Sequence, residues 1–557
     1  MIYLDLLTIF LFSLGVLLTA IAFSRTGTDM KNFFAGGGNV PWPISGLSLF
    51  MGFFSAGTFV VWGSIAYSFG WVAVMIQLSM AIAGFAVGTW IGPRWHQTHC
   101  LTAAEYINDR LGVNVQRVYT YIFLIVSVFT TGSFLYPVAK IVEVATGIPL
   151  TVSILGLGIL CMIYVSIGGL RGVVVTDVLQ FVILFAAVII VVPLSFDKIG
   201  GFEKMLTDAP DGFFSCFQGE YSMWFIISFC VYNTIFLGGN WAYVQRYTSV
   251  QTSKDSRKVG WLFGCLYVVS AVLWMLPPMI YRIYNPSLEG LDNENAYLLM
   301  CKEAMPGGLL GLMLGGMIFA TASSLNATLN ISAGVFTNDI FRRLKPEASN
   351  ATLIRVARLS TLGFGIMALI VALLVKSMGG IVSVVISVAA LTGVPLYLPL
   401  IWSLFSKRQH AGSVLGVTFI SLTINLLFKF VTPLFGLSLS RAWEMSVGAF
   451  VPVLLLALSE CYLYGRRYID PRYSSYVAKQ NSAVSNQETL SAEVVIQSRS
   501  ANHFTRQVLG VGVLLSGFMI FVLGSIPSVE SEIPMVIGVL IMCIGCLIIL
   551  KNKKEKI

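Results

Sequence analysis

Charged residues and catalytic motifs are both scarce in this chain. Asp, Glu, Lys and Arg make up 11% of its 557 residues, whereas about 25% is usual in soluble proteins. The sequence contains no GxxxxGK[ST] phosphate loop, no zinc-spaced pair of CxxC motifs, no HExxH and no GxSxG. Beyond Asp177, we expect few His, Asp or Glu residues to be buried. We therefore expect a protein that is not an enzyme.

Hydrophobic residues take the place of the missing charge. They account for 56% of the chain, and its mean hydropathy is +0.82. No charged residue occurs between Lys31 and Arg94, which leaves room for two helices of about 20 apolar residues each. The first apolar segment, 2–24, follows no basic region and is too long for the apolar region of a signal peptide, so we expect it to stay as a helix. The sequence thus predicts an all-α polytopic membrane protein.

Hydropathy predicts about fifteen transmembrane segments. They lie near residues 3–24, 44–68, 72–93, 118–142, 150–168, 174–195, 222–244, 259–283, 307–333, 357–376, 379–403, 411–431, 446–464, 507–526 and 534–550. With the N-terminus outside, most Lys and Arg fall in inner loops, as the positive-inside rule requires. We therefore expect a cytoplasmic C-terminus and location in a bacterial inner membrane.

The net charge of +9 does not indicate a nucleic-acid partner, because the basic residues are scattered over loops. Cys543 and Cys546 form a CxxC, but it falls in an apolar run where thiolates would be unsolvated, so metal binding is not expected. Cys216 and Cys301 both fall in predicted outer loops and could form a disulfide if that face is oxidising.

Three polar segments connect the apolar ones. The outer loops near 196–221 and 284–306 could form a lid, although solvated connectors are the simpler interpretation. Residues 466–506 are polar, rich in Ser, Gln and Asn, and poor in apolar periodicity. We interpret this stretch as a cytoplasmic linker that is too short for a nucleotide-binding domain.

The stretch 311–334, GLMLGGMIFATASSLNATLNISAG, combines an apolar setting with many hydroxyls. In a helix, Ala320, Ser323 and Ser324 share one face, so two hydroxyls and a carbonyl can point at one spot. Neutral oxygens without a carboxylate suit a weakly held monovalent cation such as sodium. The stretch 51–58, MGFFSAGT, is rich in small residues that invite a helix break and free carbonyl oxygens. We predict that the two stretches meet.

A second break is expected at 233–240, NTIFLGGN, five segments after the first. That spacing is what two inverted five-helix repeats would give, with broken first and sixth core helices meeting near the middle of the bilayer. Close helix packing by Gly and Ser is the alternative interpretation of either stretch.

Four longer stretches carry a resemblance to a known family. They are FFAGGGNVPWPISGLSLFMGFFSAGTF, GGLRGVVVTDVLQF, NWAYVQRY and, above all, SSLNATLNISAGVFTNDIF. On these residues the chain resembles the sodium/solute symporter family, which includes sodium/galactose, sialic acid and proline carriers. The resemblance covers roughly residues 30–465. It implies two inverted five-helix repeats with flanking helices, and sodium as the coupling ion.

The family's sodium site would take the carbonyls of Met51, Phe54 and Ala320 and the hydroxyls of Ser323 and Ser324. Asp177 matches an aspartate near the inward exit of the ion, although it could also be a helix-end charge paired with Arg171. The positions of a second sodium site hold Asn326 and Ala327, so one ion per cycle is expected.

The resemblance also implies a solute site, formed by Ser55, Thr58, Gln77, Thr130 and Asn233. These hydroxyls and amides suit a polar solute with many hydrogen bonds. A sialic acid carrier would have Arg at position 130, and a galactose carrier Glu at 77, Asn at 130 and Lys at 267, so neither specificity is carried over. Phe236 and Tyr267 are candidate gate or pocket aromatics, and Lys140 is expected to lie at the outer interface beside Glu143.

The predicted organisation is an N-terminal transmembrane helix (1–30), a ten-helix core (44–404), two flanking helices (405–465), the linker (466–506), and two C-terminal helices with a basic tail (507–557). The predicted function is sodium-driven uptake of a small polar solute, such as a sugar, a sugar acid or a related carboxylate, by alternating access. Proton coupling through Asp177, or a transporter-like membrane sensor, remains as an alternative. The lipid bilayer is the expected surrounding, and a monomer is assumed.

Overall fold

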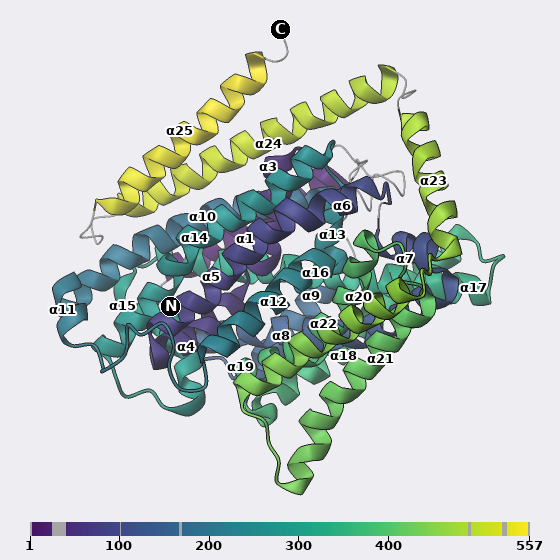
Figure 1. Cartoon of the computed structure of the whole chain (residues 1–557). Helices are drawn as coiled ribbons and strands as arrows, with labels where there is room; N and C mark the ends of the chain where they lie inside the picture. The colour runs from purple at the N-terminus through teal and green to yellow at the C-terminus, as the bar shows by residue number, and fades with distance from the viewer. Residues whose placement is uncertain are drawn as a thin grey trace.

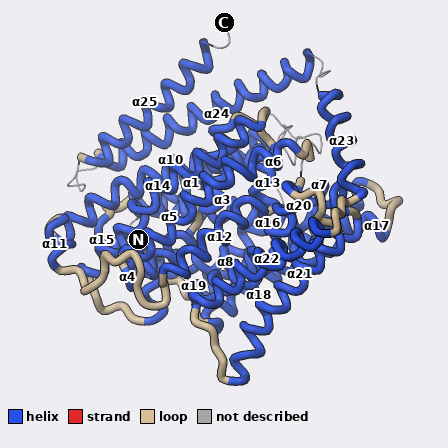
Figure 2. The backbone as a smooth tube through the Cα atoms, in the orientation of Figure 1, coloured by secondary structure: helices blue, strands red, loops and turns tan. Residues whose placement is uncertain are grey.

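The computed structural model describes residues 3–24, 40–100, 102–165, 170–487, 492–525 and 532–554, and these ranges are helical with no strand (Figures 1 and 2). The first half of the chain forms α1 (Tyr3–Ser24), α3 (Trp42–Phe53), α4 (Gly63–Phe69), α5 (Trp71–Ala86), α6 (Gly92–Gln97), α7 (Ala103–Leu111), α8 (Val113–Thr146), α9 (Leu150–Val165), α10 (Leu170–Ile199), α11 (Phe202–Thr207), α12 (Met223–Gly239), α13 (Trp241–Thr248) and α14 (Ser253–Tyr284).

The second half forms α15 (Ala296–Ala304), α16 (Leu309–Val335), α17 (Arg342–Leu344), α18 (Asn350–Leu374), α19 (Gly380–Val388), α20 (Val394–Phe405), α21 (Ala411–Leu426), α22 (Arg441–Gly465), α23 (Pro471–Gln487), α24 (Ala492–Gly524) and α25 (Ile533–Lys554). Five π-helical turns, at Thr58–Trp62, Val87–Ile91, Phe336–Phe341, Ala389–Gly393 and Leu427–Val431, and three 3₁₀ turns, at Gly290–Asn295, Val375–Met378 and Thr432–Phe435, complete the described elements.

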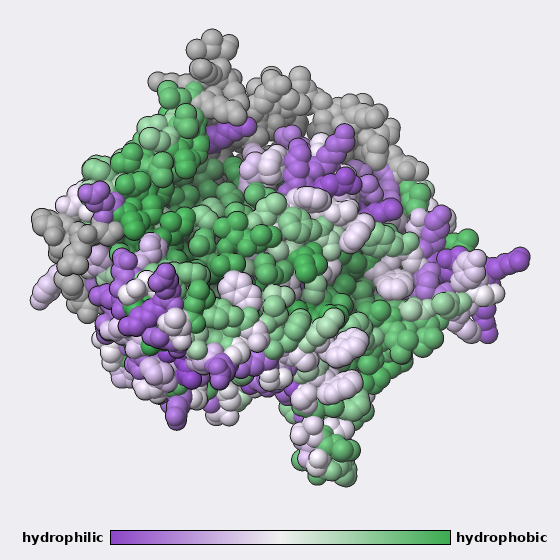
Figure 3. Space-filling model, turned by 60° about the vertical axis from the view of Figure 1, so that its left-hand side comes forward, coloured by the Kyte–Doolittle hydropathy of each residue, from purple (hydrophilic) through white to green (hydrophobic). Residues whose placement is uncertain are grey.

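Many of these helices are suited to a membrane. Within the described ranges ten are long and apolar enough to cross one, or twelve if each of two bent pairs is a single span. Three shorter apolar helices, Tyr3–Gly15, Leu150–Ile159 and Leu309–Ala322, join them. Hydrophobic side chains cover much of the face in Figure 3, and hydrophilic ones gather towards its edges. The polytopic all-α prediction is confirmed, while the total of fifteen spans stays a prediction.

Both predicted helix breaks are present. The α3 axis and the axis of Thr58–Phe69 differ by 55°, and α12 and α13 differ by 60°. At the second break Asn240 has extended backbone angles, φ −64° and ψ 129°, and its Oδ1 accepts a hydrogen bond of 3.0 Å from the N–H of Ala242. Asn240 therefore caps α13 and fixes where the new helix begins.

The N-terminal helix α1 packs against α10 and α16. Its Asp5 is buried, and Oδ1 accepts hydrogen bonds from the N–H of Gly308 at 2.6 Å and of Gly311 at 3.0 Å. A carboxylate at a helix N-terminus satisfies unpaired N–H groups and faces the positive end of the helix dipole. Asp5 thus caps α16, the helix that carries the hydroxyl-rich stretch. This role was not predicted, because one acid near the chain start has no distinctive spacing.

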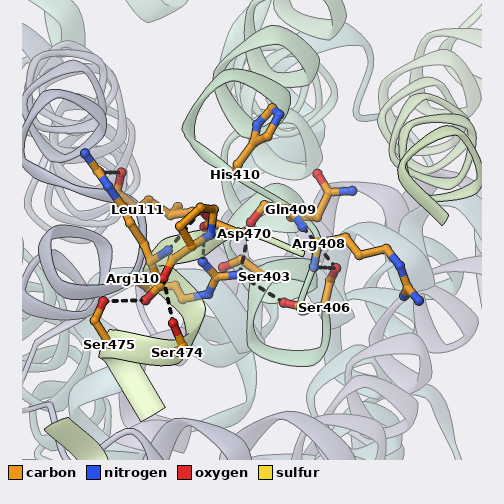
Figure 4. Close-up of polar contacts among 12 residues, drawn as sticks. Arg110, Leu111, Ser403, Ser406, Arg408, Gln409, His410, Asp470, Ser474 and Ser475 are labelled. Atoms are coloured by element: carbon orange, nitrogen blue, oxygen red, sulfur yellow. Dashed lines mark hydrogen bonds and ion pairs between the residues drawn. The ribbon is translucent and has the colours of Figure 1, made fainter. Parts of the chain in front are cut away.

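The stretch 466–506 was predicted to be a linker without apolar periodicity, but it contains helices. It is helical over Pro471–Gln487 as α23, and α24 begins at Ala492 rather than near 507. Arg110 of α7 is completely buried, with Nη1 2.5 Å from Oδ2 of Asp470 and Nη2 donating to the carbonyls of Ser406 and Gln409 at 3.2 and 3.0 Å (Figure 4). The start of α23 is thus held by polar contacts, which hydrophobic periodicity does not reveal.

The loop 284–306, predicted to lie on the outer side, is only partly a solvated connector. Its Glu294 is 3% exposed, receives a 3.0 Å hydrogen bond from the N–H of Ile381 at the start of α19, and receives another of 3.2 Å from the hydroxyl of Tyr136. The considered disulfide is not formed, since Cys301 is buried and Cys216 exposed, both as free thiols. Lys140 pairs with Glu143 at 3.0 Å, as expected.

Candidate ion and solute sites

The break after α3 leaves carbonyl oxygens without helical partners. Phe54 has φ −86° and ψ 100°, so the last four carbonyls, those of residues 51–54, have no N–H one turn further on within the helix. The Gly52 carbonyl accepts from the hydroxyl of Tyr243 at 3.4 Å, and that of Phe53 from Thr58 at 3.1 Å. Among the described residues, no hydrogen bond reaches the carbonyl of Met51 or Phe54. These are the two carbonyls of the break that were predicted to bind sodium.

The hydroxyl-rich helix α16 contacts this break directly. The N–H of Ala56 donates a hydrogen bond of 2.9 Å to Oγ1 of Thr321, which itself donates to the carbonyl of Met317 at 2.9 Å. Thr321 follows Ala320, which is 1% exposed, and precedes Ser324, whose hydroxyl donates to the Ala320 carbonyl at 3.3 Å. The two stretches therefore meet. Thr321 was missed, because its place between two nominated positions gave no separate signal.

Some of the predicted sodium ligands lie outside the described side chains. The structure does not describe the side chain of Ser323, nor those of Asn326 and Ala327. Asp177 is described: it is 3% exposed, and Oδ2 accepts a hydrogen bond of 2.7 Å from the hydroxyl of Ser48 on α3. Asp177 is thus connected to the same helix that ends at the break.

One cavity of about 160 Å³ is lined by all five predicted solute residues and by both candidate aromatics. Ser55 and Thr58 come from the break, Gln77 from α5, Thr130 from α8 and Asn233 from α12. Thr58 also supports the break, because its hydroxyl accepts from the N–H of Ser55 at 3.3 Å. Several other lining residues were not predicted from the sequence: Ser133, Phe229, Tyr232, Tyr243, Thr392 and Tyr397.

A second cavity of about 50 Å³ adjoins the first, sharing Gly52, Thr130, Phe236, Tyr243 and Tyr397 with it. It is also lined by Ser324 and Thr328 of α16 and by Arg246 of α13. The Phe236 ring lies 5.7 Å from the rings of both Tyr243 and Tyr397, so these aromatics separate the two spaces.

The known proteins that this chain resembles in sequence are transporters. Residues 33–419 match the Sodium:solute symporter family. The chain is 26% identical to the sodium/sialic acid symporter SiaT of Proteus mirabilis, over 80% of this chain and 95% of that one, and 25% identical to the sodium/glucose cotransporter of Vibrio parahaemolyticus, over 73% and 80%.

Solved structures agree on the fold. A sodium-coupled sialic acid symporter, solved in a substrate-bound outward-open state, matches with a TM-score of 0.70 and 22% identity over 82% of this chain and 97% of that one. Identity this low shows a shared fold and carries no solute specificity. This protein belongs to the sodium:solute symporter family, so it is a membrane transporter rather than an enzyme and its coupling ion is sodium.

Proposed function

We propose that the protein uses inward sodium flow to take up a small polar organic solute by alternating access. The contact between Ala56 and Thr321 carries this proposal, because it joins the break that bears the Met51 and Phe54 carbonyls to the helix that bears Ala320 and Ser324. Together with the hydroxyl of Ser323, these neutral oxygens would hold one sodium ion weakly, as neutral ligands without a carboxylate do.

Sodium at this position would order the break, and the break also lines the 160 Å³ cavity through Ser55 and Thr58. Binding of ion and solute are then coupled, since each is favoured by the same arrangement of the main chain. One ion supplies roughly 4 kcal/mol from a potential of about 100 mV and a tenfold gradient, enough for an accumulation on the order of a thousandfold.

The second cavity gives the route inward. It is lined by Ser324 and by the aromatic residues that separate the two cavities, Phe236, Tyr243 and Tyr397. We assign these three aromatic residues as the inner gate of the solute site. Asp177 would receive the departing sodium on the inner side. The two five-helix inverted repeats, an outer N-terminus, a cytoplasmic C-terminus, a bacterial inner membrane and a monomer belong to the same proposal.

The test is uptake into proteoliposomes of solutes that stabilise the purified protein. An inward sodium gradient should drive accumulation, an equal potassium gradient should not, and an inside-negative potential should increase the rate. Uptake that follows pH and ignores sodium at constant potential would indicate proton coupling through Asp177. Binding without uptake would indicate a sensor.

A further inference from the structure

We propose that the transported solute is an uncharged single-ring compound with several hydrogen-bond donors and one apolar face, such as a hexose or a cyclic polyol. This inference rests on the proposed function, because it assigns a solute class to the same 160 Å³ cavity. It narrows the expected range by excluding sugar acids and other carboxylates.

The first argument is charge, and it rests on the described residues that line the cavity, none of which is Asp, Glu, Lys, Arg or His. Two cations lie outside this lining: Lys140 pairs with Glu143 at 3.0 Å and lines a different cavity, and Arg246 lines the adjoining second cavity. A carboxylate that enters a buried space without a cation loses its hydration and gains no ion pair.

Three N–H groups of the helix break already have acceptors and do not replace that cation. Exposed N–H groups at the start of a half-helix can hold a carboxylate. Here the N–H of Ser55 donates to Thr58 Oγ1 at 3.3 Å, that of Ala56 to Thr321 Oγ1 at 2.9 Å, and that of Thr58 to the carbonyl of Ser55 at 2.9 Å. The N–H groups of Ser55, Ala56 and Thr58 are therefore engaged within the protein.

The direction of the other hydrogen bonds also disfavours an anion. The hydroxyls of Thr130, Ser133 and Thr392 donate to carbonyls one turn earlier, at 3.0, 2.8 and 2.8 Å. Asn233 donates through Nδ2 to Ser79 Oγ at 2.8 Å, so its amide oxygen is the atom that this side chain offers to a solute. These groups meet a solute as acceptors. Hydroxyl or ring N–H groups of a solute complement them, whereas a carboxylate is itself only an acceptor.

The aromatic lining suggests the ring. Phe53 stacks on Tyr243 at 4.4 Å, and Phe229, Tyr232 and Phe236 follow along α12 at separations of 5.5 and 5.3 Å. An empty apolar cavity of about 150 Å³ holds benzene, so a cavity of about 160 Å³ suits a compound with a single six-membered ring. A ring can place its apolar face on the aromatics and its donors towards α8 and Asn233.

The experiment compares matched pairs of solutes in thermal-shift and transport assays of the full-length protein. Two pairs differ only in the carboxylate, D-galactose with D-galacturonate and D-glucose with D-glucuronate. A further neutral probe is myo-inositol, and further charged probes are N-acetylneuraminate and lactate. A neutral ring probe should stabilise the protein in sodium, and its uptake should move one positive charge per solute. The proposal is overturned if a carboxylate gives the strongest stabilisation, or if none of the neutral rings binds.

Two variants test whether the aromatic lining of the cavity binds the solute. Phe236→Ala should weaken the neutral solute about tenfold or more. Trp224→Ala removes a ring from the same helix where it is 66% exposed, and should leave solute affinity unchanged. An equal effect of both variants would overturn the proposal that the aromatic lining of the cavity binds the ring of the solute. If neutral rings bind and are carried without any sodium dependence, the solute class stands and the sodium mechanism fails.

Discussion

The main-chain N–H of Ala56 lies 2.9 Å from Oγ1 of Thr321, although 265 positions separate the two residues in the sequence. Ala56 follows the end of α3, where the helix is interrupted, and Thr321 lies in the middle of α16. This hydrogen bond connects the interruption after α3 to α16, the helix with the hydroxyl-rich stretch. It gives the proposed coupling between ion and solute a physical route.

Replacing Thr321 with Val should remove the hydrogen bond from Ala56 with little change in the volume of the side chain. The buried N–H of Ala56 would lose its acceptor, at a cost of about 1–3 kcal/mol in the free energy of unfolding. Sodium affinity should fall as well, because the break is no longer held against α16. Thermal unfolding and sodium titration in detergent would measure both effects. Thr321→Ser should restore them, and equal behaviour of the Val and Ser variants would contradict the role of the hydroxyl.

Asp5→Ala should destabilise α16 from its N-terminal end. The N–H groups of Gly308 and Gly311 would lose their shared acceptor, which typically costs about 1–2 kcal/mol for a helix cap. Asp5→Asn keeps an acceptor and should recover part of the loss. The unfolding temperatures of the three proteins give the comparison, and an unchanged value for Asp5→Ala would show that α1 does not support the ion-site helix.

Asp470→Ala should be far more harmful than loss of a neighbouring exposed pair. It leaves the fully buried guanidinium of Arg110 without its carboxylate, which costs about 3–5 kcal/mol in comparable cases. Lys479→Ala removes the Lys479–Asp109 pair on α23, where the lysine side chain is 64% exposed, and should cost less than about 1 kcal/mol. Similar unfolding temperatures for the two variants would contradict the docking of α23 through Arg110.

Glu294 should make stability depend on pH. Burial raises its pKa above the ordinary 4.5, against the opposing effects of its hydrogen bonds and of Lys140, while Asp292 adds to the rise. A carboxyl with a raised pKa in the folded protein stabilises fully below its ordinary pKa, and that stabilisation is lost as pH rises through the raised value. The unfolding temperature should therefore fall as the solution is taken from acidic to neutral pH.

Glu294→Gln provides the control for this effect, because the amide oxygen can still accept from Ile381 and the side chain does not ionise. Unfolding temperatures of both proteins from about pH 4 to about pH 8 should diverge as pH rises, with the wild type falling relative to the variant. Parallel curves would mean that Glu294 does not ionise against a burial cost.

Composition and short-range pattern were sufficient to predict the apolar helices, the two breaks and the approach of the first break to the hydroxyl-rich stretch. A membrane imposes long apolar helices, and clusters of small residues mark where a helix can be interrupted. The contacts that depend on distant residues were not predictable in the same way. Asp5, Thr321 and Arg110 each act through a partner more than 250 positions away, and nothing near them in the sequence indicates that partner.

The polar segment at 471–487 shows the same limit. Hydropathy treats it as a connector, because few apolar residues recur along it. Its position is fixed instead by Arg110, Asp470 and Arg472, whose Nη1 donates to the carbonyl of Leu111. A few buried polar contacts can order a helix that hydrophobic periodicity does not reveal.

The most direct test of the ion site is sodium-dependent stabilisation of the purified protein at constant ionic strength, with potassium as the replacement ion. Ser324→Ala should shift the sodium concentration for half-maximal stabilisation upward by about tenfold, since a hydroxyl ligand contributes on the order of 1 kcal/mol. Thr328→Ala, one turn further along α16, should leave it unchanged. If Ser324→Ala behaves like the wild type, sodium does not bind between the break at Phe54 and α16.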